Sequence, residues 1–132
     1  MLKHAHVHAT LPASDLARAR KFWENSVGLT PVEESPAGVW YGAGDTRFLL
    51  FPSSGKPSGD HTQVGFSVDD IHATVDHLHT NGVHFEEYDM PGLKTEQHVA
   101  SLPNGDKTAW FHDTEGNLIG VIQRANVPAA TH

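Results

Sequence analysis

Hydrophobic and polar residues alternate along the first stretch of the chain, from His4 to Leu11. Period-two alternation is typical of a half-buried strand, because successive side chains of a strand point to opposite faces. The pattern predicts a strand with one apolar face, covered by a helix, and one polar face that lines a cavity. The polar face carries His4, His6, His8 and Thr10, and the apolar face carries Ala5, Val7, Ala9 and Leu11.

A helical pattern follows this strand. Residues 12–15 form a predicted turn that ends in Asp15, a residue type that caps helix N-termini. Apolar residues then recur at helical spacing from Leu16 to Val27, and Gly28 follows as a terminating residue. The sequence therefore predicts a helix over 16–27.

The same order of elements begins again fifty-five residues later. Residues 63–70 alternate and end in acidic capping residues, and apolar residues recur at helical spacing over 71–78. This offset superposes His8 on Gln63. The chain therefore contains an internal repeat of a strand followed by a helix.

Shorter apolar runs complete each copy of the repeat. They predict a short strand and a turn within 29–38 and strands over 39–42 and 47–51 in the first half, and strands over 83–88, 108–112 and 117–122 in the second. The long stretch 89–107 is predicted to be irregular, either a segment that closes over an apolar ligand at the cavity mouth or a surface loop. An offset of seventy superposes Trp40 on Trp110 and Leu50 on Gly120.

Two β-α-β-β-β modules in a pseudo-twofold repeat account for nearly the whole chain. Each module has a strand face that it cannot cover alone, so the modules are expected to pair. We predict an α+β fold in which they form a cupped, eight-stranded mixed sheet around a cavity. Residues 1–132 form a single domain: module one 1–52, linker 53–60, module two 61–123 and tail 124–132.

Composition excludes several classes of function. The 132 residues contain no cysteine, which excludes disulfides and thiolate zinc sites. The formal net charge of −7 has the wrong sign for holding a phosphate backbone. The sequence contains no apolar run of about 18 or more residues. We therefore expect a cytoplasmic protein without a nucleic-acid or membrane partner.

The chain resembles the vicinal oxygen chelate superfamily, which includes glyoxalase I, extradiol dioxygenases, fosfomycin-resistance enzymes and bleomycin-resistance proteins. The resemblance covers about residues 4–123. It implies a glyoxalase-like fold and a homodimer, with the cavity at or near the interface. The motifs that carry it are Leu11–Asp15 running into Phe22-Trp23 and Gly28-Leu29, the strand Val64–Asp69, and the turn Phe111–Leu118.

Metal-dependent members of that superfamily place four ligands on cavity-facing strand positions. The resemblance matches those positions to His8, Leu50, Gln63 and Gly120. A divalent ion such as Ni, Zn, Mn, Co or Fe needs about four to six ligands, and only His8 and Gln63 could contribute here. We therefore expect no cofactor, unless His6 or His61 completes an unfamiliar set.

Two functions remain open. The first is a metal-independent binding protein, similar to the bleomycin-resistance branch, that sequesters an apolar or aromatic ligand such as an antibiotic. The second is a glyoxalase-like lyase or isomerase, or a dioxygenase-type enzyme, that uses His8 as general base or metal ligand. Its carboxylate partner would be Glu86, Glu87 or Asp89.

The predicted site residues are those that parity and the resemblance place on the cavity wall. Phe48 and Trp40 lie an even number of residues from Leu50, and Trp110 lies an even number from Gly120. Strand alternation therefore predicts that all three face the cavity. The complete predicted set is His6, His8, Trp40, Phe48, Leu50, Gln63, Trp110 and Gly120.

Overall fold

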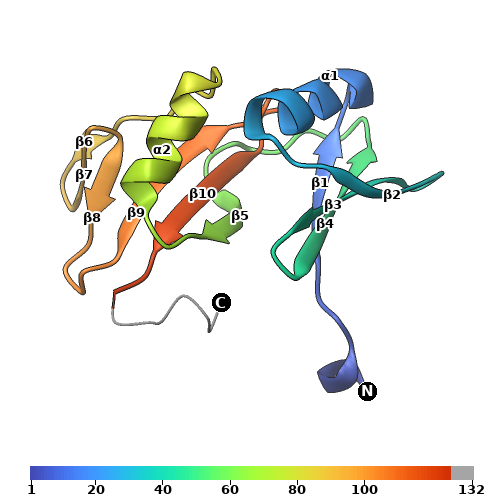
Figure 1. Cartoon of the computed structure of the whole chain (residues 1–132), viewed down its shortest axis with the longest axis horizontal. Coiled ribbons are helices and arrows are strands. Elements are labelled where there is room, and N and C mark those ends of the chain that lie inside the picture. The colour runs from blue at the N-terminus through green and yellow to red at the C-terminus, as the bar shows by residue number, and fades with distance from the viewer. Residues whose placement is uncertain (126–132) are drawn as a thin grey trace.

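Two β-sheets, each with helical structure across one face, make up the fold (Figure 1). The structure is a computed structural model that describes residues 1–125. It confirms the predicted α+β class and the two modules in tandem. None of the helices within the described residues is long and apolar enough to cross a membrane.

The first module contains a four-stranded sheet in the order β1-β4-β3-β2. Strand β1 runs parallel to β4, and the other neighbours are antiparallel. A short 3-10 helix, η1, precedes the module, and a π-helix, η2, continues α1. The elements are η1 (Leu2–His4), β1 (Ala9–Ala13), α1 (Leu16–Lys21), η2 (Phe22–Val27), β2 (Pro31–Ser35), β3 (Gly38–Ala43) and β4 (Thr46–Pro52).

The second module contains a six-stranded sheet in the order β5-β10-β9-β8-β7-β6. Strand β5 runs parallel to β10, as β1 does to β4 in the first module. Helix α2 lies across β9 and β10 (Figure 1). The elements are β5 (Thr62–Ser67), α2 (Ile71–Thr80), β6 (Asp89–Met90), β7 (Leu93–Glu96), β8 (Val99–Ser101), β9 (Lys107–His112) and β10 (Leu118–Gln123).

The predicted strand from His4 is wrong in its first half, because β1 begins only at Ala9. Ala9 pairs in parallel with Phe48, so His8 and Val7 would face Arg47 and Thr46, and the residues before Val7 would need partners before Thr46, where the chain turns away into β3. The segment 5–8 therefore extends from the body of the protein (Figure 1), and Val7 is 96% exposed. From Ala9 onward the alternation holds, since Leu11 and Ala13 are buried and Thr10 is exposed.

The second module differs from its prediction between residues 83 and 107. Residues 83–88 form one isolated bridge, Phe85 to Phe111, in place of the predicted strand. The stretch 89–107, predicted to be irregular, contains β6, β7 and β8. The β7–β8 turn places Gln97 and His98 at φ 51° and 72°. Such turns normally use Asn-Gly, so the sequence carried no hairpin signal here.

Both helices begin where the sequence predicts. The Asp15 side chain accepts a hydrogen bond from the Arg18 N–H (3.0 Å), and Asp70 accepts one from the Ala73 N–H (3.1 Å). The first helix ends at Gly28, which adopts a left-handed φ of 89°. Its last turns form a π-helix, which sequence periodicity did not predict.

One hydrophobic core joins the two modules, and Trp23 lies at its centre. Its side chain is fully buried. The indole ring lies 5.2 Å from Phe48 of the first sheet, and 6.2 Å and 6.3 Å from Phe66 and Phe111 of the second. The helical segment of module one therefore packs against both sheets.

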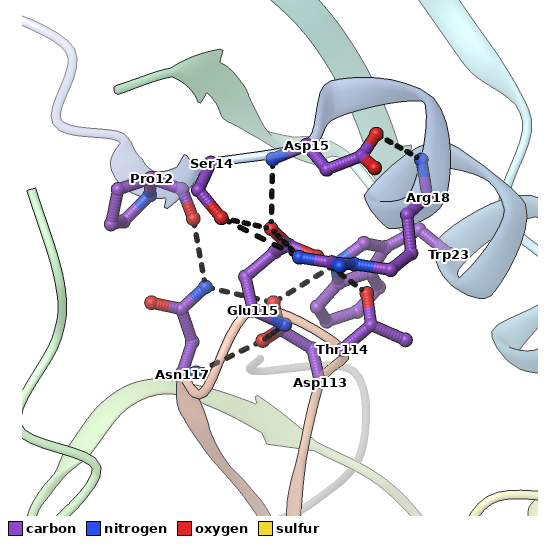
Figure 2. Close-up of polar contacts among 9 residues, drawn as sticks. All are labelled: Pro12, Ser14, Asp15, Arg18, Trp23, Asp113, Thr114, Glu115 and Asn117. Atoms are coloured by element: carbon purple, nitrogen blue, oxygen red, sulfur yellow. Dashed lines mark hydrogen bonds and ion pairs between the residues drawn. The ribbon is translucent and has the colours of Figure 1, made fainter. Parts of the chain in front are cut away.

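The β9–β10 turn contacts the N-terminus of α1 (Figure 2). The Glu115 carboxylate accepts hydrogen bonds from Arg18 Nε (2.8 Å), Ser14 Oγ (3.2 Å) and the Asp15 N–H (3.1 Å). Its side chain is only 1% exposed, whereas that of Arg18 is 52% exposed. We call this set of contacts the Glu115 clamp.

A second set of hydrogen bonds lies beneath the clamp. Asp113 Oδ2 accepts from Trp23 Nε1 (3.3 Å) and from Asn117 Nδ2 (2.8 Å). Asn117 Nδ2 also donates to the carbonyl of Pro12 (3.1 Å), as Figure 2 shows. The turn of module two is thus bonded to the end of β1, to the cap of α1 and to the central tryptophan.

Replacing Glu115 with glutamine tests the clamp. The hydrogen bond from Arg18 lowers the pKa of the Glu115 carboxyl from 4.5 to about 2. A carboxyl with a depressed pKa stabilises the fold above its unfolded pKa and loses that contribution as the pH falls through the folded pKa. Glu115→Gln should lower the free energy of unfolding at neutral pH by about 2–3 kcal/mol and flatten the stability loss between pH 4.5 and 2, measured by urea denaturation.

Glu34→Gln is the matched control. Glu34 also pairs with an arginine, Arg20, at 2.8 Å, but its side chain is 61% exposed. An exposed pair contributes less than about 1 kcal/mol, so this variant should unfold close to wild type. Equal losses for the two variants would contradict the role of the clamp.

Candidate functional site

A cleft of about 570 Å³ lies between the two modules. It is bordered by residues 7–9 at the start of β1, by the β3–β4 turn and by β5. Both β1 and β5 pair with only one neighbour each within the described chain, so their other edges are unpaired. The polar residues on its wall include His8, Asp45, Arg47 and Ser67.

His8 borders this cleft and contacts Trp40. The two ring centres are 4.6 Å apart in an edge-to-face arrangement. The Arg47 guanidinium lies 5.7 Å from the centre of the same indole and pairs with Glu33 at 3.2 Å. The half-buried Trp40 therefore contacts both an imidazole and a guanidinium, and both groups favour stacking with an aromatic ring.

Trp110 belongs to a separate group on the second sheet. Its Nε1 donates to Thr62 Oγ1 (3.1 Å), and its ring packs edge-to-face with Tyr88 at 5.4 Å. Gly120 is buried beside it, and a Cβ there would lie 3.1 Å from Thr62 Cγ2. Gly120 thus makes room for the Trp110 side chain and its hydrogen-bond partner.

Phe48 and Leu50 lie on the opposite face from Trp40, contrary to the parity prediction. Trp40 pairs with Leu49, whereas Phe48 pairs with Tyr41. The side chains of Phe48 and Leu50 are 4% and 0% exposed, in the core beneath the helix, although Phe48 still borders the cleft.

Turn length explains this difference between the two modules. The β3–β4 turn contains two residues, and the β9–β10 turn contains five. The number of turn residues sets the register, and a shift of one residue reverses the face of every side chain. The structural counterpart of Gly120 is therefore Leu49, not Leu50.

Gln63, which the resemblance matches to a cavity-facing position, falls at an irregularity of β5. Leu118 pairs with Thr62 and Ile119 with Val64, so Gln63 is the extra residue of a β-bulge. Thr62, not Gln63, contacts Trp110. The Gln63 Oε1 atom is buried without a hydrogen-bond partner within the described residues.

The two remaining predicted histidines lie on the surface. His6 is in the exposed segment before β1 and is not part of the cleft wall. His61 is exposed, with its Nδ1 atom 3.2 Å from Ser58 Oγ. The structure thus groups His8 with Trp40, and Trp110 with Gly120, and separates these pairs from the other predicted residues.

Sequence reasoning missed His112. Its Nδ1 lies 2.8 Å from Glu86 Oε1, and its Nε2 lies 3.0 Å from the Gly59 carbonyl. Burial lowers the pKa of His112, but these two hydrogen bonds outweigh that effect, so the pKa is raised above 6.5. His112 lies two residues after Trp110, so strand alternation places both on the same face. This spacing could have predicted that His112 lies near the candidate site.

A family model matches residues 5–121, that of the Glyoxalase/Bleomycin resistance protein/Dioxygenase superfamily. The chain belongs to this superfamily. The resemblance predicted from the motifs is therefore confirmed. Comparison with the curated proteins gave no match.

Solved structures of this superfamily share the fold. A lactoylglutathione lyase from Agrobacterium tumefaciens is 25% identical, with a TM-score of 0.63, and the match covers 91% of this chain and 93% of that one. An antibiotic-binding protein from Streptomyces sp. CB03234 is 25% identical, with a TM-score of 0.62 and coverage of 92% and 97%. A putative glyoxalase family protein from Bacillus anthracis, 15% identical with a TM-score of 0.70 and coverage of 92% and 96%, shows the fold alone.

The donor set of this superfamily member does not fit a metal ion. Of the four positions that the resemblance assigns to ligands, only His8 has a side chain that binds metals well. The structural counterparts on the last strands, Leu49 and Gly120, have no donor atom. Across residues 1–125, no three His, Asp or Glu side chains come close enough together to hold an ion.

The pKa of His112 provides a test of its contacts. Because the raised pKa favours the charged ring in the folded state, this contribution to stability is present below pH 6.5 and is lost as the pH rises through the folded pKa. An NMR titration of the imidazole nitrogens should give a midpoint above 6.5, and Glu86→Gln should lower it.

Glu87→Gln is the control, because Glu87 faces His98 (3.4 Å) rather than His112. It should leave the His112 midpoint unchanged. A midpoint at or below 6.5 in the wild-type protein would show that the two hydrogen bonds do not hold in solution.

Proposed function

We propose that this chain binds an aromatic or apolar small molecule in the cleft between its modules, without a metal ion, and sequesters it. The observation that carries the proposal is that His8 and Arg47 lie on the wall of a 570 Å³ cleft and that Trp40 packs against both of them. Ligand sites typically enclose about 300–1,000 Å³ and combine apolar surface with a few polar groups.

The chemistry of this wall favours a ligand with an aromatic ring. A ring that binds beside His8 at the edge of the cleft would also reach the indole of Trp40, which packs against His8. Offset or edge-to-face packing of two rings contributes about 0.5–1.5 kcal/mol beyond burial. Arg47 and His8 supply hydrogen-bond donors for a polar substituent on that ring. Apolar surface from Val64 and Phe66 on β5 completes the opposite wall.

Two of the structural neighbours support a role in resistance. One is named an antibiotic-binding protein and another a fosfomycin resistance protein, the latter at 10% identity. An aromatic antibiotic is therefore the ligand class that we propose first. Sequestration needs only affinity and concentration, so it requires no metal ligands.

An enzymatic function is the second candidate, favoured by the 25% identity to a lactoylglutathione lyase. His8 would be its general base. However, the His8 ring packs against Trp40, and the carboxylate of Glu86 pairs with His112 instead. Binding without turnover is therefore the better-supported proposal.

We also propose that two copies of the chain form a homodimer. The open faces of the two sheets carry Trp40 and Trp110, and β1 and β5 have unpaired edges within the described residues. A second copy that covers these surfaces would close the cleft against water.

Sedimentation velocity at micromolar concentration should give twice the chain mass of 14.4 kDa, and a monomer would contradict this part of the proposal.

Substitution of Trp40 tests the binding site. Trp40→Ala should weaken binding of an aromatic antibiotic by tenfold or more, because tryptophans in the centre of a site contribute about 2 kcal/mol or more. The measurement is isothermal titration of a panel of aromatic antibiotics against chelator-treated protein. Affinity should be unchanged by EDTA and by added Ni, Zn, Mn, Co or Fe ions.

Met90→Ala is the control, since Met90 is a 49% exposed side chain on the outer strand β6. It should bind as the wild type does. Binding that survives Trp40→Ala, or that appears only with an added metal ion, would contradict the proposed site. Conversion of the bound compound would instead favour the enzymatic candidate.

A further inference from the structure

A second pocket of about 390 Å³ lies on the helix-covered side of the module boundary. Its lining is almost entirely apolar and comes from both modules. Val27, Leu29 and Ala43 belong to the first module, and the second contributes the face of α2 and the strands beneath it. The complete lining is Val27, Leu29, Ala43, Phe66, Val68, Ala73, Thr74, His77, Leu78, Phe111 and Val121.

The π-helix η2 shapes one wall of this pocket. Val27 is its last residue, and Gly28, at a left-handed φ of 89°, redirects the chain so that Leu29 also borders the pocket. Single π-helical turns are rare and occur often at functional sites. Val27, Leu29, Phe66 and Val68 are only half-buried, so four apolar side chains from separate segments converge on an accessible space.

The pocket offers a ligand few polar groups. Thr74 and His77, neighbours on one face of α2, are the polar residues of the lining. The Thr74 hydroxyl donates to the Asp70 carbonyl at 2.9 Å, so its hydrogen bond is already formed. The His77 imidazole is then the main polar group of an otherwise hydrophobic compartment.

This compartment adjoins the cleft of the proposed function. Ala43, Phe66 and Val68 line both spaces, so the two share a wall made of one small and two apolar residues. The cleft carries the polar side chains of His8, Asp45 and Arg47, and the second pocket is almost entirely apolar. A molecule that reached from one space into the other would meet polar groups at one end and apolar side chains at the other.

We infer that the ligand is elongated and amphipathic, with an aromatic, polar end beside His8 and Trp40 and an apolar tail between η2 and α2. This inference rests on the proposed function, because the aromatic end occupies the cleft described above. It adds the ligand class: an aromatic compound with an alkyl or similarly apolar extension. Rings without such an extension fill only the first part of the site.

The probes that test this are 4-alkylphenols, from 4-methylphenol to 4-heptylphenol, titrated calorimetrically into the 132-residue chain. The phenol ring suits Trp40 and His8, and each added methylene tests the apolar compartment. Affinity should rise by about fourfold for each buried methylene, the increment expected for one CH₂ group removed from water. Ala73→Trp should abolish this rise, because Ala73 is an exposed residue of α2 that borders the pocket.

Ala17→Trp is the matched control, the same substitution at an exposed position of α1 away from the pocket. It should keep the wild-type rise. Ala43→Leu, at the shared wall, should weaken the long phenols more than 4-methylphenol. Far-UV circular dichroism checks that each variant folds.

The outcomes separate this inference from the proposed function. If the affinity of the wild-type protein does not rise with alkyl length, or rises equally in Ala73→Trp, the apolar pocket does not bind the tail. If binding is nevertheless weakened by Trp40→Ala, the proposed function stands. If Ala73→Trp abolishes the rise but Trp40→Ala leaves the affinity of every phenol unchanged, the aromatic site is overturned instead. Absence of binding by every phenol overturns both. If Ala73→Trp dissociates a dimer, the pocket is a contact between copies and the inference is wrong.

Discussion

The packing of Trp23 between the two sheets is the interaction on which the rest of the structure depends. Its ring contacts Phe48 of one module and Phe111 of the other, and its Nε1 donates to Asp113 in the β9–β10 turn. The Glu115 clamp fixes the same turn to the cap of α1. Both the cleft and the apolar pocket lie between modules, so their shape depends on this junction.

Local sequence signals were sufficient to predict the helices and the repeat. Asp15, Asp70 and Gly28 act as caps or terminators through their own side chains or backbone freedom, so their effect is readable from single residues. The partner of a strand, in contrast, can lie far away in the sequence, so it cannot be predicted from the residues of the strand itself. The segment 5–8 alternates like a strand, but β4 begins only at Thr46, so the register leaves residues 5 and 6 without a partner in it. The β7–β8 hairpin forms around Gln97-His98, which is not a recognisable turn sequence.

Side-chain direction at the candidate site was predictable only where the register was simple. Trp110 and Gly120 share a face as expected, because their hairpin has an odd turn length. Because the turn of the first module has two residues, Leu50 and Phe48 face the core rather than the cavity. At the bulge in β5, Thr62 rather than Gln63 contacts Trp110. The pairing of His112 with Glu86 joins residues 26 positions apart, a contact that the sequence pattern of either segment could not specify.

The central claim is that an aromatic ligand binds against Trp40 in the cleft between the modules. The chain has three tryptophans: Trp23 lies in the core, Trp40 on the first sheet and Trp110 on the second. Fluorine NMR of protein labelled with 5-fluorotryptophan gives one resonance for each. On addition of an aromatic ligand, the Trp40 resonance should shift and the Trp23 resonance should stay in place. A ligand that shifts Trp110 alone, or none of the three, would contradict the claim.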